Sequence, residues 1–543
     1  MAPRQEPVGP AALELPLEMP AVTLTNPELG LVALAFGGAA VLVSTVVDAA
    51  DARLLRAGAL LVRAPALAAV DAPENSAPKP DRWELAVPDW LGGETWTATA
   101  DPEPTGRAEP AAQHGPAGQN GVAAGLPAPP PIPPAELADT LVPLIRNAGL
   151  VELATRTVKR SRWLIRGEKG MAAVLVDDTV TLRRHEVAVA RYREATIDPV
   201  TCSARALAWL CDALEAAGAT LLDEPVPLPV RLGAPATGLP DLPDPDVVVP
   251  GEPAAIVFAA LIRTDARSLW TADLAVRSDA ARGVATLHRA VVDLASDLRV
   301  FSGILDADAT VEVVNDLAWL DDQLAEVRDL GALRRRLLDE PEEFGPLDDV
   351  LAGHETAARK RLVATLGLPR YRRMLDGLVR LARNPGAALE RDEQTLARAA
   401  AQPAEAWLEE AFATTIATMA KRLKRAGTSG RDVWASWREV QVQAAALEVL
   451  GRAAVLTGSR NAIAYAKATH KLRRKTDAVA TAARSSRGMR EFALRGSAPD
   501  PAVVFALGQA SAVAAAEAAD GVRDMIEEFP DRRRKLARKA AAS

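Results

Sequence analysis

Cysteine and histidine are scarce in this chain. Only two of its 543 residues are cysteine, Cys202 and Cys211. They form neither a disulfide framework nor a CxxC metal pair, which fits a reducing, cytoplasmic location. The five histidines show no HxxxH or HExxH spacing, so we expect no histidine-based metal site. Glycine-rich phosphate loops and the GxSxG nucleophile motif are absent as well.

Long apolar runs are also scarce, and the first residues, MAPRQEPVGP, lack the apolar core of a signal peptide. One uncharged stretch of 19 residues, 29–47, is long enough to cross a bilayer. Gly37-Gly38 divides it into two β-branched runs, which is typical of a hairpin turn. We therefore expect two buried strands here and no membrane span.

The composition is that of a soluble globular protein, with 49% apolar residues, 25% charged residues and a net charge of -7. Residues 1–250 hold 20 Lys and Arg against 31 Asp and Glu, and residues 251–543 hold 44 against 40. Neither part is basic enough to predict a nucleic-acid partner.

The first 230 residues contain short β-like runs separated by Gly, Pro and Asp, with two helical stretches at about 135–149 and 202–217. Strands in bulk with a few helices predict an α+β domain over 1–230. A low-complexity Ala, Gly and Pro segment at about 101–134 interrupts it as an insertion. A Pro-rich linker is expected at 231–252.

From residue 253 onward, apolar residues recur at helical spacing and strand signals disappear. An all-helical domain is predicted over 253–520, followed by a basic tail at 521–543. The domain contains an internal sequence repeat. Val284 corresponds to Val433 at an offset of 149 residues, and Asp329 corresponds to Asp477 at an offset of 148. Two segments at nearly one offset predict a duplicated helical bundle.

The helical region resembles the CHAD family over about 255–520. Its segment LAWLDDQLAEVRDLGAL is similar to the family's LxWLxxxLGxxRDLDxL, and LPRYRRMLDGL is similar to RYxxLLxxL. The resemblance implies two pseudo-repeated helical bundles that bind inorganic polyphosphate. A polyanion is held by charge-assisted hydrogen bonds from Arg, Lys and His, so such residues should line the site.

The first 230 residues resemble the CYTH family, through VVDAADARLLRAGALLVRA against YYDTxDxRLxRxGxxLRxR. This resemblance implies an antiparallel, β-barrel-like triphosphate tunnel. Catalysis in that family relies on glutamates that hold a divalent metal and on basic residues that grip phosphates.

Most basic positions of the CHAD pattern are replaced in this chain. Alignment on Phe301 and on Glu448 places these residues there: Ala285, His288, Val292, Asp293, Ala295, Trp434, Trp437, Gln441, Ala444 and Ala445. An Asp at a phosphate-facing position, as at Asp293, would repel the ligand. The binding face of both helices therefore looks rewritten, and Trp434 and Trp437 would bury apolar area in its place.

Other basic residues remain as candidates for phosphate binding. In the helical region they are His288, Arg328, Arg372, Arg373, Lys421, Lys424, Arg425, Lys471 and Arg474. In the first region they are Arg53, Arg63, Arg107, Arg156 and Lys159. A solvated helix face is the simpler interpretation of the helical charge runs.

The acidic residues that a CYTH enzyme needs are incomplete. No ExExK motif occurs, and Glu14, with Pro16 and Pro20 nearby, is the nearest substitute. Asp177 and Glu194 fit the closing strands of the family. With these three as the catalytic candidates, hydrolysis is not expected, and no metal or cofactor is expected either.

These observations predict a cytoplasmic, non-catalytic CYTH-CHAD-like binding or scaffold protein. Its expected partner is polyphosphate or another phosphate-rich anion, bound weakly, or else a protein. The alternative is a divergent triphosphatase acting on tripolyphosphate or an organic triphosphate, which would require Mg²⁺.

Overall fold

The computed structural model describes most of the chain. The described residues are 9–20, 22–65, 81–99, 131–168, 170–305, 307–338, 341–385, 402–428, 433–458, 461–494 and 501–541. Of the insertion expected at 101–134, residues 101–130 lie outside the described residues, and Arg107 is among them.

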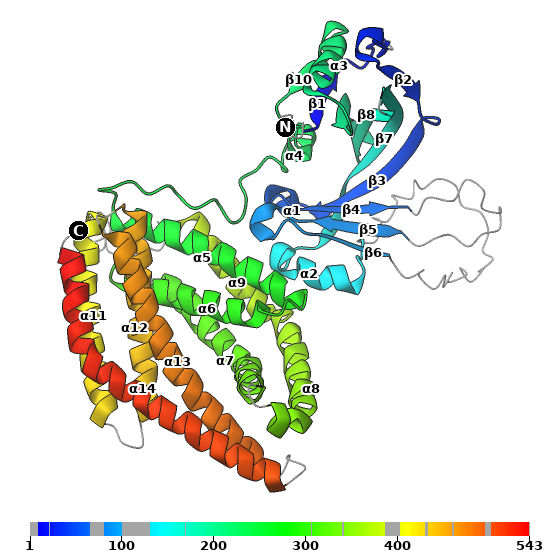
Figure 1. Cartoon of the computed structure of the whole chain (residues 1–543). Helices are drawn as coiled ribbons and strands as arrows, with labels where there is room; N and C mark the ends of the chain where they lie inside the picture. Colours follow the sequence, from blue (N-terminus) through cyan, green and yellow to red (C-terminus); the bar gives the residue numbers. More distant parts are fainter. Residues whose placement is uncertain are drawn as a thin grey trace, which may run out of the picture. The chain divides into compact units, whose positions relative to one another are not determined.

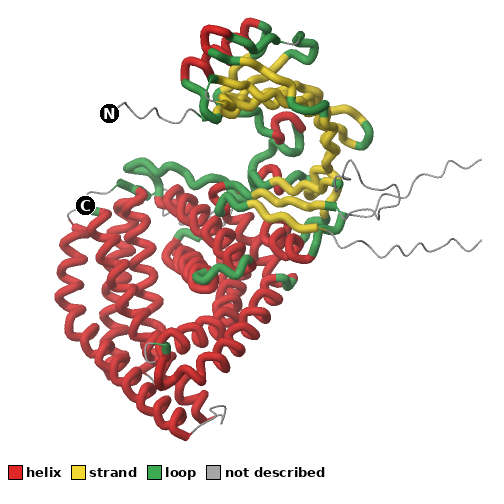
Figure 2. Tube along the Cα trace, turned by 45° about the vertical axis from the view of Figure 1, so that its right-hand side comes forward, coloured by secondary structure: helices red, strands yellow, loops and turns green. Residues whose placement is uncertain are grey.

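The chain divides into two compact units, one ending at Pro240 and the other beginning at Asp241. The first is built around an antiparallel sheet. In the second, the described residues from Ala254 onward form helices and their short connections (Figures 1 and 2). The predicted α+β class is therefore confirmed. The two helical stretches expected in the first unit are α2 (Ala135–Ile145) and α3 (Ala204–Ala216).

Ten strands form one sheet in the order β10-β1-β9-β8-β7-β3-β4-β5-β6, and β2 also pairs with β7. Their bounds are β1 Ala11–Leu15, β2 Val32–Ala35, β3 Ala40–Ala49, β4 Leu60–Ala64, β5 Arg82–Ala86, β6 Thr95–Thr99, β7 Leu150–Gly167, β8 Gly170–Arg184, β9 Val187–Pro199 and β10 Thr220–Leu222. Within the described residues no pairing joins β6 to β10. The sheet is thus open in these residues. The predicted antiparallel sheet is confirmed, whereas the barrel-like form that the resemblance implied does not extend to a closed tunnel.

The Gly37-Gly38 pair is not a hairpin turn. β2 and β3 follow one another along the same edge of β7: Ala35 lies opposite Trp163, and Ala40 lies opposite Arg160. The 18-residue β7 is long enough to pair with both, so the glycines only interrupt one antiparallel ladder. No residue of β2 is buried. Two strands were predicted correctly, but the hairpin and the burial of β2 were wrong.

Each face of the sheet has its own apolar core. Ser203 caps α3 by accepting a hydrogen bond from the Ala206 N–H at 3.2 Å, and α3 then buries Leu207, Leu210 and Leu214 on one face. On the other face, α4 (Leu228–Leu232) contributes Leu232 to a second cluster. The remaining short helices are η1 Pro27–Leu29, α1 Arg53–Arg56 and η2 Asp89–Leu91.

The second unit consists of long helices, of which α11 to α14 lie side by side (Figure 1). The bounds are α5 Ala254–Arg277, α6 Gly283–Val300, η3 Phe301–Gly303, α7 Ala307–Leu337, α8 Pro341–Leu366, α9 Pro369–Arg383, α11 Ala404–Thr428, α12 Val433–Leu456, α13 Ala462–Leu494 and α14 Pro501–Ala541. The residues expected as a basic tail from 521 onward continue α14 as far as Ala541.

The helix starts support the predicted duplication. α11 begins 150 residues after α5, and α12 begins 150 residues after α6. The segments that precede α5 and α11 pair with each other reciprocally: the Ala254 N–H donates to the Gln402 carbonyl at 3.1 Å, and the Ala404 N–H donates to the Glu252 carbonyl at 2.9 Å. Such mutual pairing is what a two-fold relation between repeats produces. We call α5–α9 the first repeat and α11–α14 the second.

One described helix, α14, contains a stretch that is long and apolar enough by composition to cross a membrane, over Pro501–Ala537. About 33% of the 18-residue window that meets this criterion is buried inside the protein. Its apolar residues Val503 and Leu507 pack in a cluster with Leu333 of α7, Leu351 of α8 and Met489 of α13. A long core helix has the same composition as a span.

Trp437 of α12 is one of the largest fully buried side chains, with 1% of its surface exposed. Its indole Nε1 donates to the Thr476 carbonyl of α13 at 3.1 Å, while Trp434 is only half-buried. The burial expected for a Trp at this position is confirmed for Trp437. The side chain therefore fills space that would otherwise be open between α12 and α13.

We expect Trp437→Ala to lower the free energy of unfolding by about 3–5 kcal/mol, because it leaves a large cavity and removes the hydrogen bond of the indole. Urea unfolding and the melting temperature measure the effect. Trp434→Ala is the matched control and should cost less than half as much. Equal losses in both variants would contradict this assignment.

Candidate functional site

Three carboxylates lie in one row across the first-unit sheet. Glu14 of β1 lies directly opposite Glu194 of β9, which lies opposite Asp178 of β8, and Arg160 of β7 completes the row. Directly paired residues share one face of a sheet, so all four side chains project from the same side. Like charges side by side destabilise a sheet unless cations compensate them.

Arginines compensate this row. Arg231 of α4 donates to Glu14 at 2.7 Å, and its guanidinium carbon lies 4.2 Å from the centre of the Tyr192 ring. Arg160 grips Asp178 through two hydrogen bonds of 2.8 and 2.7 Å. Bidentate and stacked contacts of this kind suit the planar guanidinium group. Two of the three acids are therefore already engaged.

Glu194 occupies the middle of the row. Burial raises its pKa above the usual range, and the nearby acids Asp178 and Glu14 act in the same direction. The guanidinium groups of Arg156 and Arg231 oppose this shift. Of the predicted catalytic residues, the structure thus brings Glu14 and Glu194 together, and it adds Asp178, which the sequence analysis had not chosen.

Asp177 does not belong to this row. Successive side chains of a strand point to opposite faces, and Asp177 faces the other side of β8, where Arg193 donates to it at 2.9 and 2.8 Å. Lys159 is exposed, and it lies opposite Thr179 on that same outer face. The fit of Asp177 and Glu194 to the closing strands therefore identified the strands, but it did not show that these two side chains lie on opposite faces of the sheet.

The residues of the row do not fit a divalent cation. Among the described residues, no group of three His, Cys, Asp or Glu side chains is placed to hold a metal ion. Glu14 and Asp178 instead accept hydrogen bonds from Arg231 and Arg160. A guanidinium group already supplies the positive charge that a metal would bring.

The basic residues near β3 and β4 have structural partners. Arg53 bonds the Asp51 carboxylate and the Ile145 carbonyl, the latter at 3.0 Å. Arg63 contacts Glu152. Through these contacts, the two arginines hold α1 and β4 against neighbouring elements of the first unit.

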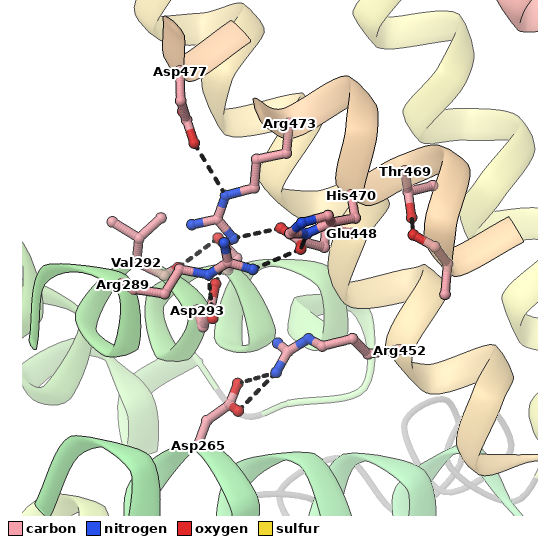
Figure 3. Close-up of polar contacts among 12 residues, drawn as sticks. Asp265, Arg289, Val292, Asp293, Glu448, Arg452, Thr469, His470, Arg473 and Asp477 are labelled. Atoms are coloured by element: carbon pink, nitrogen blue, oxygen red, sulfur yellow. Dashed lines mark hydrogen bonds and ion pairs between the residues drawn. The ribbon is translucent and has the colours of Figure 1, made fainter. Parts of the chain in front are cut away.

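In the helical unit, a closed ring of ion pairs joins the two repeats (Figure 3). Arg473 of α13 bonds both Asp293 of α6 and Glu448 of α12, the latter at 2.8 Å. Arg289 of α6 bonds the same two acids at 2.8 and 2.6 Å. His470 adds a 2.7 Å contact to Glu448. Charges alternate around the ring, and we call it the inter-repeat ring.

This ring changes the interpretation of Asp293. The sequence analysis treated it as a free negative charge that would repel a phosphate. It is instead neutralised from within by Arg289 and Arg473. Despite burial, Arg473, His470 and Arg289 hold the pKa of Glu448 below its usual range. Both acids therefore serve as internal counter-ions.

Next to the ring lies a second buried group, the aspartate triad. Arg452 of α12 donates to both carboxylate oxygens of Asp265 (α5) at 2.7 Å and to Asp297 (α6) at 3.1 Å. The Asp265 and Asp297 residues are 4% and 0% exposed. This contact also crosses from the first repeat to the second.

A third group lies closer to solvent. Arg328 of α7 approaches the His288 ring at 2.7 Å, and His288 lies 3.2 Å from Asp321. Arg484 of α13 lies 3.2 Å from Asp329. Burial lowers the pKa of Arg484, and the neighbouring charge of Arg328 lowers it further. Two of the predicted residues, His288 and Arg328, thus meet in what we call the edge group.

The other predicted cations of the helical unit are dispersed. They lie on α9, α11 and α13: Arg372, Arg373, Lys421, Lys424, Arg425, Lys471 and Arg474. All are exposed except Arg372, which is half-buried. Sequence reasoning missed Arg289, Arg452 and Arg484. The signal was available for Arg452, since Glu448 and Arg452 are the only charges in the otherwise apolar run 444–456 of α12 and stand four residues apart.

Comparison with known proteins identifies part of the helical unit: residues 260–484 match the model of the CHAD domain. No curated protein matches the chain. The crystal structure of the CHAD domain from the plant Ricinus communis is 17% identical, with a TM-score of 0.39, covering 55% of this chain and 96% of that chain. PptA from Streptomyces chartreusis is 18% identical, with a TM-score of 0.38, covering 51% of this chain and 99% of that chain. The antiparallel first-unit sheet is consistent with, but not identified as, a CYTH domain.

We expect Arg473→Ala to destabilise the helical unit by about 3–5 kcal/mol, because Asp293 and Glu448 would remain buried with too little positive charge. Chemical denaturation measures the loss. Arg474→Ala removes an exposed guanidinium one residue away and should change stability by less than about 0.5 kcal/mol. A similar effect of both substitutions would refute a stabilising role for the ring.

Proposed function

We propose that this protein is a cytoplasmic, non-catalytic binding or scaffold protein. In this proposal it binds polyphosphate or another phosphate-rich anion only weakly, and a protein is the alternative partner. The CHAD match over 260–484 supports the relation to polyphosphate-binding domains. One observation carries the proposal: Arg473, 5% exposed at its side chain, is held between Asp293 and Glu448.

Binding of a polyanion needs guanidinium donors that are free to turn toward it. Arg289 and Arg473 already direct donors at two carboxylates, and Arg452 directs its donors at two more. A phosphate that displaced these acids would leave them buried without partners, which costs more than the new contacts return. The carboxylates thus accept the hydrogen bonds that a bound phosphate would otherwise accept.

The cations that remain available lie near the surface. Lys471 and Arg474 are exposed on α13, and Lys421 and Lys424 are exposed on α11. Exposed charges of this kind attract anions through long-range electrostatics, which salt screens. They support weak, salt-sensitive contact with phosphate-rich molecules and not a defined site.

We expect calorimetric titration with medium-chain polyphosphate to give at most weak binding at low salt and none at higher salt. The variant Asp293→Asn/Glu448→Gln keeps the shape of the ring but frees Arg289 and Arg473. Its affinity should rise about tenfold or more, since a charge-assisted hydrogen bond contributes about 1.5–3 kcal/mol.

Glu528→Gln/Asp531→Asn is the control, because it also removes two negative charges, but from exposed ion pairs that involve α14. Little change in affinity is expected for it. Tight, saturable binding by the unaltered protein would overturn the proposal.

A second candidate function is that of a divergent inorganic triphosphatase in the first unit. The observation that favours it is the row of Glu14, Glu194 and Asp178, with Arg156 and Arg160 on the same strand face of β7. The engagement of Glu14 by Arg231 and of Asp178 by Arg160 weighs against it. We therefore place it second.

We expect the unaltered protein to release no phosphate from tripolyphosphate in the presence of Mg²⁺, in a colorimetric phosphate assay. Release that disappears in Glu194→Gln and persists in Asp177→Asn, which alters the opposite face, would instead establish the triphosphatase.

A further inference from the structure

The aspartate triad carries an imbalance of charge. Two carboxylates, Asp265 and Asp297, share one guanidinium, that of Arg452. If both acids were ionised, the triad would hold a net negative charge in a place from which water is excluded. Burying a charge without a partner is strongly unfavourable, and a buried acid usually responds by holding its proton.

The geometry points to the acid that holds the proton. Asp265 receives both of its hydrogen bonds from Arg452, one on each carboxylate oxygen. Asp297 receives one bond on Oδ1, and its Oδ2 is buried without a hydrogen-bond partner among the described residues. Both carboxylates accept hydrogen bonds from the same guanidinium, so Asp265 lies beside Asp297. A proton on Asp297 Oδ2 could thus be donated to Asp265.

The elements around α6 offer no further cation to Asp297 within the part of the chain that the structure describes. The charges one turn away on α6, α12 and α13 belong to the inter-repeat ring, where Asp293 and Glu448 consume Arg289 and Arg473. On α7, the edge-group residues Asp321 and Arg328 contact His288. His288 precedes Asp297 by nine residues on α6, so these charges lie away from the triad. On α6 itself, Arg299 is exposed. The arginines of α5 are engaged by other acids: Arg263 by Asp246, Arg267 by Asp244 and Arg277 by Asp273.

We propose that the Asp265–Asp297 pair shares one proton in the folded protein, carried on Asp297, and that this proton makes the contact between the two repeats weaker as pH rises. Loss of the proton to solvent would place a second negative charge beside Arg452 and loosen the packing of α5 and α6 against α12. This inference concerns the interface itself and does not depend on any bound anion.

The electrostatic environment agrees with this assignment. Burial raises the pKa of Asp297 well above its ordinary value, and the charge of Asp265 raises it further, while Arg452 opposes both. An acid whose pKa is higher in the folded state binds its proton on folding. Above the ordinary value of 3.8, the folded protein therefore holds one proton more than the unfolded chain, and stability falls as pH rises until Asp297 itself ionises.

Urea unfolding of the full chain at a series of pH values tests the proposal. One extra proton in the folded state raises the unfolding equilibrium constant about tenfold per pH unit. Asp297→Asn mimics the protonated acid and has no proton to lose at this position. Its logarithm of the unfolding constant should therefore rise with pH by about one unit less per pH unit than that of the unaltered protein. The infrared difference between the two proteins, recorded in the pH range where their stabilities diverge, should contain a protonated-carboxyl C=O stretch.

Asp265→Asn is the second variant and serves if Asp297→Asn does not fold. It leaves Asp297 alone with Arg452, so Asp297 should ionise, and both the slope increment and the carboxyl stretch should disappear. Asp316→Asn, at the half-exposed pair with Arg370, is the control and should keep both signals. Equal slopes and no carboxyl difference in the two triad variants would overturn the proposal.

Discussion

The pairing of buried arginines with carboxylates from facing helices is the interaction on which the helical unit depends. Arg473 and Arg452 each reach from the second repeat to acids of the first repeat. A guanidinium cannot be neutralised by losing its proton at ordinary pH, so once buried it requires an acid at a defined position. The inter-repeat ring and the aspartate triad therefore fix how α5 and α6 lie against α12 and α13.

The same requirement operates in the first unit with the signs reversed. There the sheet register brings Glu14, Glu194 and Asp178 together, and arginines are supplied to them. Arg231 comes from α4, far along the chain, whereas Arg160 comes from the adjacent strand. In both units, most of the arginines and carboxylates that a phosphate-processing or phosphate-binding site would use form ion pairs with each other. This internal neutralisation is the physical basis of the binding or scaffold role proposed above.

The two repeats retain a common framework but not a common chemistry. The reciprocal pairing around Pro253 and Pro403 relates equivalent segments of the repeats. In contrast, the position of His288 in the first repeat is occupied in the second by Trp437, which is fully buried. A buried Trp stabilises by apolar area and a buried ion pair by charge compensation, so the two repeats can diverge in polarity while the helices keep their packing.

The sequence by itself determined the class of each unit, because strand and helix periodicities depend on local spacing alone. It also predicted an internal repeat, from two matching helical segments at offsets of 149 and 148 residues, and the burial of Trp437, from the place of this residue in the alignment to the CHAD pattern. The pairing of charges was decided by the tertiary structure. Asp178 and not Asp177 joins Glu194 because the register of β8 against β9 sets which side chain faces inward, and one residue of shift reverses it. Asp293 appeared to be a repelling charge because Arg473, its partner, is 180 residues away, and only packing of α6 against α13 brings the two together.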